Sequence, residues 1–153
     1  MKRLLLLSIS LLLAACSSPP ARQQALSDEQ MNDLVIYAMS LADTPYRYGG
    51  NSADSGFDCS GFVGHVYRQT LGVSLPRTSR EISRVGTPIS RSDLRPGDLV
   101  FYNTLRASFS HVGIYIGNGK FVHSPKSGDR VRVEQMQMRY WQERFDGARR
   151  IGG

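Results

Sequence analysis

The stretch that decides the fold is HVGIYIGNGKFVH, residues 111–123. Two runs of apolar and β-branched residues flank a Gly-Asn-Gly turn, and this pattern is typical of a β-hairpin. A histidine stands at each outer end of the hairpin. The geometry of the turn therefore decides whether the two imidazole rings lie on the same face of the sheet.

The length of the loop sets this register. A two-residue loop, Asn118-Gly119, would place His111 and His123 on opposite faces. A three-residue loop, Gly117-Asn118-Gly119, would pair Gly113 with His123 and leave room there for a ring. We predict the three-residue loop, because its final glycine suits a type I turn followed by a left-handed residue. His111 and His123 then share a face as diagonal neighbours.

Further strands are expected on both sides of the hairpin, and helical patterns precede them. The strands are predicted at 98–102, 130–133 and 148–151, and the helices at 28–42, from Asp58 to about Leu71, after Thr78, and around 140–141. Helices first and a strand meander afterwards indicate an α+β fold. We expect the N-terminal helices to pack on a C-terminal antiparallel β-sheet.

The N-terminal residues have the pattern of an export signal. Lys2 and Arg3 precede an apolar run at 4–13, which is too short to span a membrane. The following Ala14-Ala15-Cys16 resembles a bacterial lipobox, so we predict a lipoprotein signal peptide at 1–15, lipidation of Cys16, and a polar tether at 16–26. The remaining 27–153 suits one domain with one core. A serine after the anchor cysteine favours the periplasmic face of the outer membrane over the inner membrane.

The net charge of the chain excludes few classes of binding partner. The formal net charge is +6, which would suit an acidic polymer such as cell wall, an anionic lipid surface or nucleic acid. The export signal argues against nucleic acid. We expect a monomer, attached to the membrane by its N-terminal lipid.

The second cysteine lies in FDCSGFV, residues 57–63. With Cys16 lipidated, Cys59 has no partner for an internal disulfide, so it is either a small buried side chain or a reactive thiol. If Asp58 caps a helix, Cys59 takes the first helical position. There the helix dipole and free N–H groups would lower the thiol pKa from about 8.5, and the Ser60 amide could receive an oxyanion. We expect the Asp58 carboxylate to turn back onto the helix amides.

Three histidines are available to act with this thiol. His65 lies on the same helix but on another face, so we expect it at the surface or rim. His111 could serve as general base, with His123 orienting it. Each could also be an ordinary strand residue. A zinc site formed by Cys59, His111 and His123 is an alternative with suitable ligand types.

Together these residues resemble the NlpC family of papain-like cell-wall cysteine peptidases. The motifs that carry the resemblance are PYRYGG at 45–50, FDCSGFV at 57–63, LPR at 75–77, LRPGDLV at 94–100, HVGIYIG at 111–117 and FVH at 121–123. They run in the family's order over 28–151. Within the family the chain is most similar to the small outer-membrane murein endopeptidase lipoproteins of the Spr type.

The resemblance implies a papain-like fold and a role for each site residue. It implies that Cys59 is the nucleophile, that His111 is the general base and that His123 orients it. It also implies that the Tyr46 hydroxyl contributes to the oxyanion site, although a loop one residue longer than in the Spr type leaves Tyr48 as a rival. No cofactor and no metal are implied.

The implied substrate is the stem peptide of peptidoglycan, cut between a D-residue and meso-diaminopimelate. The bond would be either the D-alanyl cross-link or the D-γ-glutamyl bond within one stem. Arg47, Arg77 and Arg80 are candidates to bind stem-peptide carboxylates, or they form a solvated charged face. Two other functions stay open: a non-catalytic peptidoglycan-binding lipoprotein, and an acyltransferase or amidase on the same fold.

Overall fold

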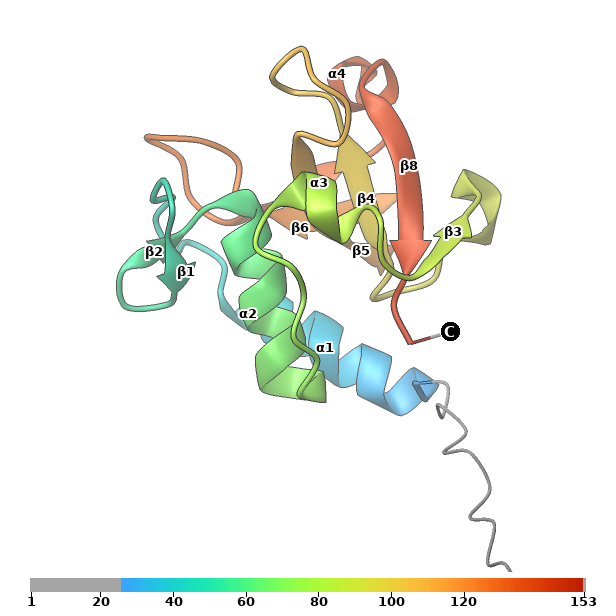
Figure 1. Ribbon diagram of the computed structural model, residues 1–153, viewed down its shortest axis with the longest axis horizontal. Helices are drawn as coiled ribbons and strands as arrows, with labels where there is room; N and C mark the ends of the chain where they lie inside the picture. Colours follow the sequence, from blue (N-terminus) through green and yellow to red (C-terminus); the bar gives the residue numbers. More distant parts are fainter. Residues whose placement is uncertain (1–25, 153) are drawn as a thin grey trace, which may run out of the picture.

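The computed structural model describes residues 26–152, and Figure 1 shows their arrangement. The helices are α1 (Asp28–Ser40), α2 (Cys59–Leu71), α3 (Ser79–Ile82) and α4 (Arg139–Gln142), with a 3-10 turn η1 (Arg91–Asp93). The strands are β1 (Asn51–Ser52), β2 (Gly56–Phe57), β3 (Thr87–Ile89), β4 (Leu99–Tyr102), β5 (His111–Gly117), β6 (Lys120–His123), β7 (Arg132–Gln135) and β8 (Phe145–Arg150). The predicted signal peptide, lipidation site and most of the tether lie outside the described residues.

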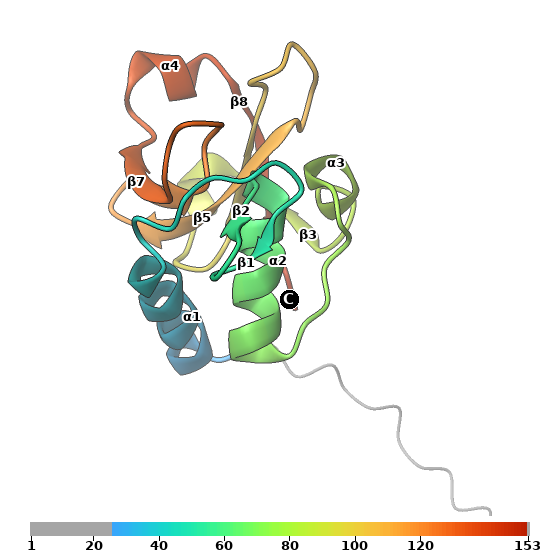
Figure 2. The ribbon, with the colours of Figure 1, turned by 90° about the vertical axis from the view of Figure 1, so that its left-hand side faces the viewer.

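The two long helices begin where the sequence predicts. Ser27 and Gln30 form a capping box at the start of α1, in which each side chain accepts a hydrogen bond from the other's backbone N–H. Asp58 caps α2, which ends at Gly72 in the left-handed conformation. The two helices lie side by side in both views (Figures 1 and 2). Within residues 26–152, no helix has the length and apolar character needed to cross a membrane.

Six strands form one antiparallel sheet in the order β3-β8-β4-β5-β6-β7. Helices before a strand meander confirm the predicted α+β class. Several details differ from the prediction. β7 begins two residues later than expected, and β8 begins three residues earlier. The short pair β1–β2 was not predicted, nor was the edge strand β3, whose sequence, Thr-Pro-Ile, is short and contains proline.

The β5–β6 hairpin corrects the predicted loop. Gly117 pairs with Lys120, so the loop is the two-residue Asn118-Gly119, and both residues have positive φ, 51° and 69°. These signs are those of a type I′ turn. A bulge between Tyr115 and Gly117 then restores the register, with Ile114 opposite Val122. The predicted three-residue loop is wrong, but Gly113 opposite His123 is confirmed.

The central strands of the sheet are buried on both faces. One face packs on α1 and α2 through a cluster that includes Phe62 and Val66 of α2 and Phe101 of β4. The other face carries a second cluster built around Trp141 of α4, comprising Val100, Tyr102, Phe121, Met136, Trp141 and Ala148. Figure 2 shows α4 at the opposite end of the molecule from α1 and α2. Because both faces of β4 are buried, all four of its residues are apolar.

Candidate active site

Cys59 lies at the first position of α2, as the sequence predicts. Asp58 has extended backbone angles and its Oδ1 accepts a hydrogen bond from the Gly61 N–H at 2.7 Å, so the carboxylate turns back onto the helix as expected. The backbone amides of Val112, Ser60 and Cys59 itself lie close enough to the sulfur to lower the thiol pKa. The thiol therefore lies where the start of α2 meets the start of β5.

The electrostatics of this thiol differ from the sequence prediction. Burial, followed by the negative charge of Asp58, raises the pKa of the Cys59 thiol to about 11. The surrounding amides lower the pKa, but by less. The predicted lowering was wrong because it counted the helix start and omitted the desolvation of the sulfur against the sheet.

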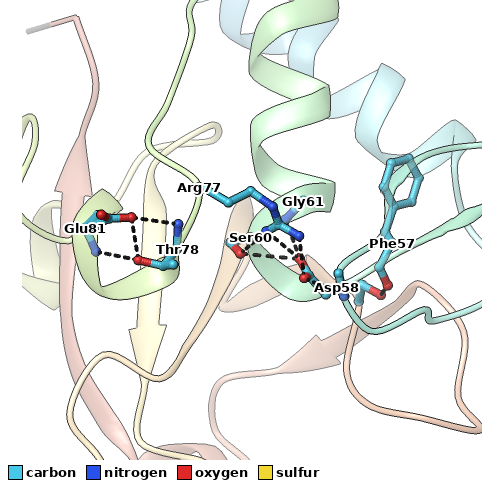
Figure 3. Close-up of polar contacts among 9 residues, drawn as sticks. Phe57, Asp58, Ser60, Gly61, Arg77, Thr78 and Glu81 are labelled. Atoms are coloured by element: carbon cyan, nitrogen blue, oxygen red, sulfur yellow. Dashed lines mark hydrogen bonds and ion pairs between the residues drawn. The ribbon is translucent and has the colours of Figure 1, made fainter.

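An ion pair holds the cap of α2 in place. Arg77 donates to Asp58 through Nη1 at 3.1 Å and Nη2 at 2.6 Å, and through Nη1 to the Ser60 hydroxyl at 2.9 Å. Figure 3 shows the Arg77 side chain reaching Asp58 and Ser60 from the segment that precedes α3. A capping box between Thr78 and Glu81 fixes that segment. Arg77 thus joins the segment before α3 to the start of α2.

The two strand histidines contact one another directly. Nε2 of His111 and Nδ1 of His123 are 2.7 Å apart, and the rings are perpendicular. Since one nitrogen of this pair must donate and the other accept, the tautomers of the two rings are linked. Because Nε2 of His111 is engaged by His123, Nδ1 is the nitrogen of His111 left for other chemistry.

Burial keeps both rings neutral near pH 7. Desolvation lowers the pKa of His111 to about 4. Desolvation also holds the pKa of His123 well below its usual value, with further lowering by the charges of His111 and Arg132. Trp141 covers the pair, stacked on His111 at 5.9 Å and perpendicular to His123 at 5.1 Å between ring centroids. Trp141, the chain's one tryptophan, was not among the residues predicted to form the site.

The two candidate oxyanion tyrosines differ in position. Tyr46 is half-buried and forms a β-bridge with Phe57, two residues before Cys59. Burial, followed by the charges of Cys59 and Asp58, raises the pKa of Tyr46. Tyr48 is 88% exposed. Tyr46 is therefore the better placed of the two to reach an oxygen at Cys59.

The remaining predicted residues form other contacts or face solvent. His65 Nε2 shares a hydrogen bond with the Tyr37 hydroxyl at 3.0 Å, and its ring stacks on Tyr37, so it joins α2 to α1. Arg47 and Arg80 are exposed. Within residues 26–152, no set of three His, Cys, Asp or Glu side chains has the arrangement of a metal site. In the zinc alternative, His111 and His123 would each give a ring nitrogen to the metal. Nε2 of His111 and Nδ1 of His123 are hydrogen-bonded to each other instead.

A pocket of about 390 Å³ opens beside His111. Trp141 and Tyr140 of α4 form part of its wall, with Leu105 from the loop between β4 and β5. The site thus combines a thiol held among backbone N–H groups, a neutral imidazole pair and an adjoining pocket. Such a set can perform nucleophilic acyl transfer, in which the imidazole moves protons.

Several known proteins are similar to this chain. Murein DD-endopeptidase MepH of Escherichia coli K12 is 42% identical over 134 residues, which cover 86% of this chain and 48% of MepH. Probable endopeptidase YafL of the same strain is 43% identical over 133 residues, 82% of this chain and 53% of YafL. The chain therefore spans about half the length of these two relatives. Probable endopeptidase NlpC, also from that strain, is 40% identical over 156 residues, covering 99% of this chain and all of NlpC.

Solved structures agree with these relatives. An NlpC/P60 family protein from Bacillus cereus has a TM-score of 0.75 at 34% identity, covering 80% of this chain and 40% of that one. The NlpC/P60 domain of the peptidoglycan hydrolase SagA has a TM-score of 0.68 at 33% identity, covering 78% and 98%. The family model described as NlpC/P60 matches residues 43–150. By sequence and by fold, the chain belongs to the NlpC/P60 family.

Proposed function

We propose that this chain is a peptidoglycan endopeptidase of the cysteine type, which hydrolyses a stem-peptide or cross-link bond between a D-residue and meso-diaminopimelate. The observation that carries the proposal is the position of the Cys59 thiol, at the start of α2 and beside β5, whose first residue His111 pairs with His123. The names of relatives support the substrate. MepH and MepS are murein DD-endopeptidases, and a 38% identical relative from Bacillus subtilis is a gamma-DL-glutamyl hydrolase.

The resting site holds a neutral thiol and a neutral imidazole. In the productive tautomer, the Nε2–H of His111 donates a hydrogen bond to Nδ1 of His123. Nδ1 of His111 then carries no proton and keeps a lone pair. This lone pair accepts the thiol proton as the sulfur attacks. Because burial disfavours both charges, proton transfer and attack occur together rather than through a standing thiolate.

The first half of the reaction forms a thioester. The sulfur of Cys59 bonds to the amide carbon, and the carbonyl electrons move to oxygen. The N–H groups of Cys59 and Ser60 and the hydroxyl of Tyr46 stabilise this oxyanion. When it collapses, the carbon–nitrogen bond breaks and His111 gives its Nδ1 proton to the leaving amine.

The second half releases the acyl group to water. His111, neutral again, takes a proton from water as the water oxygen attacks the thioester carbon. The carbon–sulfur bond breaks, and the proton returns from His111 to the sulfur of Cys59. One water is consumed, and one carboxylic acid and one amine are produced.

Digestion of purified sacculi tests the proposal and identifies the bond. The wild-type chain is incubated with sacculi, and soluble products are separated by mass. Conversion of cross-linked dimers to monomers selects the D-alanyl cross-link, whereas shortened stems select the D-γ-glutamyl bond. Cys59→Ala serves as the inactive control. Binding of sacculi by the wild-type chain without any cleavage would favour the non-catalytic alternative.

The envelope location is also part of the proposal. Relatives named murein endopeptidases act on the cell wall, which supports an envelope-associated protein. The lipobox-like residues before Cys16 support lipid attachment on the periplasmic face of the outer membrane. Cells fed a labelled fatty acid should label the wild-type chain and not Cys16→Ala. Equal labelling of both chains would contradict the assignment.

A further inference from the structure

The pocket beside His111 has in its wall the residue that, in the proposed reaction, gives its proton to the leaving amine. The thiol of Cys59 does not line this pocket. Its volume of about 390 Å³ falls in the range of small-molecule sites.

The walls of the pocket combine apolar and charged groups. Leu105, Met138 and Tyr140 line it and are 75%, 51% and 45% exposed. Large apolar side chains left in water around a hollow are typical of a binding site. Leu105 comes from the loop between β4 and β5 and the other two from the region of α4, and both segments lie at the same end of the molecule (Figures 1 and 2).

The charges in the pocket give it a positive balance. Lys126 and Arg132 line it with one carboxylate, Glu134, and His111 is neutral. Arg132 is committed to Glu134 at 2.8 Å and to Asp129 at 3.1 Å. Lys126 forms no ion pair with any carboxylate of residues 26–152, so it is the cation available to a ligand.

We infer that this pocket binds the leaving-side residue of the substrate, a diamino acid whose free carboxylate pairs with Lys126 and whose methylene chain lies against Trp141, Leu105 and Met138. The inference rests on the proposed function for the direction of the substrate. It assigns Lys126 as the residue that recognises the part of the substrate released as an amine. Diaminopimelate has such a carboxylate at its D-centre in either candidate bond, whereas lysine at the same position lacks it.

A matched pair of peptides tests the inference by binding. The two peptides carry diaminopimelate with its D-centre carboxyl either free or as the carboxamide, and calorimetry measures their affinity for the full chain carrying Cys59→Ala. We expect about fivefold tighter binding of the free acid, as for a charge pair at a solvated rim. Adding Lys126→Met should remove this preference. Adding Lys120→Met, an exposed lysine that does not line the pocket, should leave it unchanged.

Equal affinity for acid and carboxamide would overturn the inference, and so would a preference that survives Lys126→Met. Hydrolysis by the otherwise wild-type chain separates this result from the proposed function. Cleavage of both peptides without an acid preference leaves the peptidase proposal intact and removes the pocket assignment. An acid preference in binding with no cleavage of either peptide keeps the pocket assignment and removes the peptidase proposal.

Discussion

Replacing His123 with leucine tests the role of the histidine pair. His123 is fully buried against Phe121 and Trp141, so an apolar side chain of similar size suits its surroundings. The change removes the acceptor for the Nε2–H of His111, which sits 2.7 Å away and is itself 3% exposed. We therefore expect a folded protein in which His111 loses its productive tautomer.

The size of the effect follows from the hydrogen bond. Leaving a buried donor without its acceptor costs about 1–3 kcal/mol. This cost falls on the Nε2–H tautomer, the only one whose Nδ1 accepts the thiol proton. A penalty of about 1–3 kcal/mol on that tautomer lowers kcat/KM roughly 5- to 150-fold.

The assay compares two substitutions at one position. Initial rates on a defined muropeptide give kcat/KM for wild type, His123→Leu and His123→Asn, and thermal melting confirms that each is folded. The asparagine carbonyl can accept from His111, so His123→Asn should recover most of the loss. The reasoning is refuted if His123→Leu stays within threefold of wild type, or if His123→Asn is no better than His123→Leu.

Three further expectations concern the thiol, its cap and the histidines. Cys59→Ser should abolish hydrolysis while leaving the melting temperature within a few degrees of wild type; residual turnover above background would contradict the nucleophile. Arg77→Met should cost about 1 kcal/mol or less of stability in denaturant titration, because Arg77 is 46% exposed and its pair with Asp58 is screened by water; a loss of several kcal/mol would show that the pair is worth more. Folded His111 and His123 have lowered pKa values, so the unfolded chain binds more protons below pH 6.5, and stability should fall as pH drops from 6.5 toward 4. A double variant without both histidines should lose much of this acid slope in urea titrations, and an unchanged slope would contradict the burial of neutral rings.

Local patterns made the start of α2 predictable. Asp58, Cys59 and the closing Gly72 are neighbours in sequence along one helix, and capping is a property of such neighbours. The pairing of Gly113 with His123 was also predictable, although by a different turn from the one expected. Two changes of one residue cancelled: the loop is shorter, and the bulge adds the residue back.

Long-range packing was the part that sequence patterns missed. The direction of the Cys59 pKa depends on how deeply the sheet buries the sulfur, which helix-start reasoning does not measure. The ion pair of Arg77 with Asp58 joins residues that are 19 positions apart, so no local sequence motif predicts it. Trp141 reaches the histidines only because α4 folds over the far face of the sheet.

Trapping the covalent intermediate is the most direct test of the central claim, that the Cys59 sulfur takes the acyl group from the peptide. Wild-type protein is mixed with a muropeptide, quenched in acid within one turnover, digested and analysed by mass. The account predicts that the peptide containing Cys59 gains the mass of the carboxylic acid product less one water, and that Cys59→Ala gains nothing. Product formation by wild type with no such adduct, together with full activity in Cys59→Ala, would contradict it.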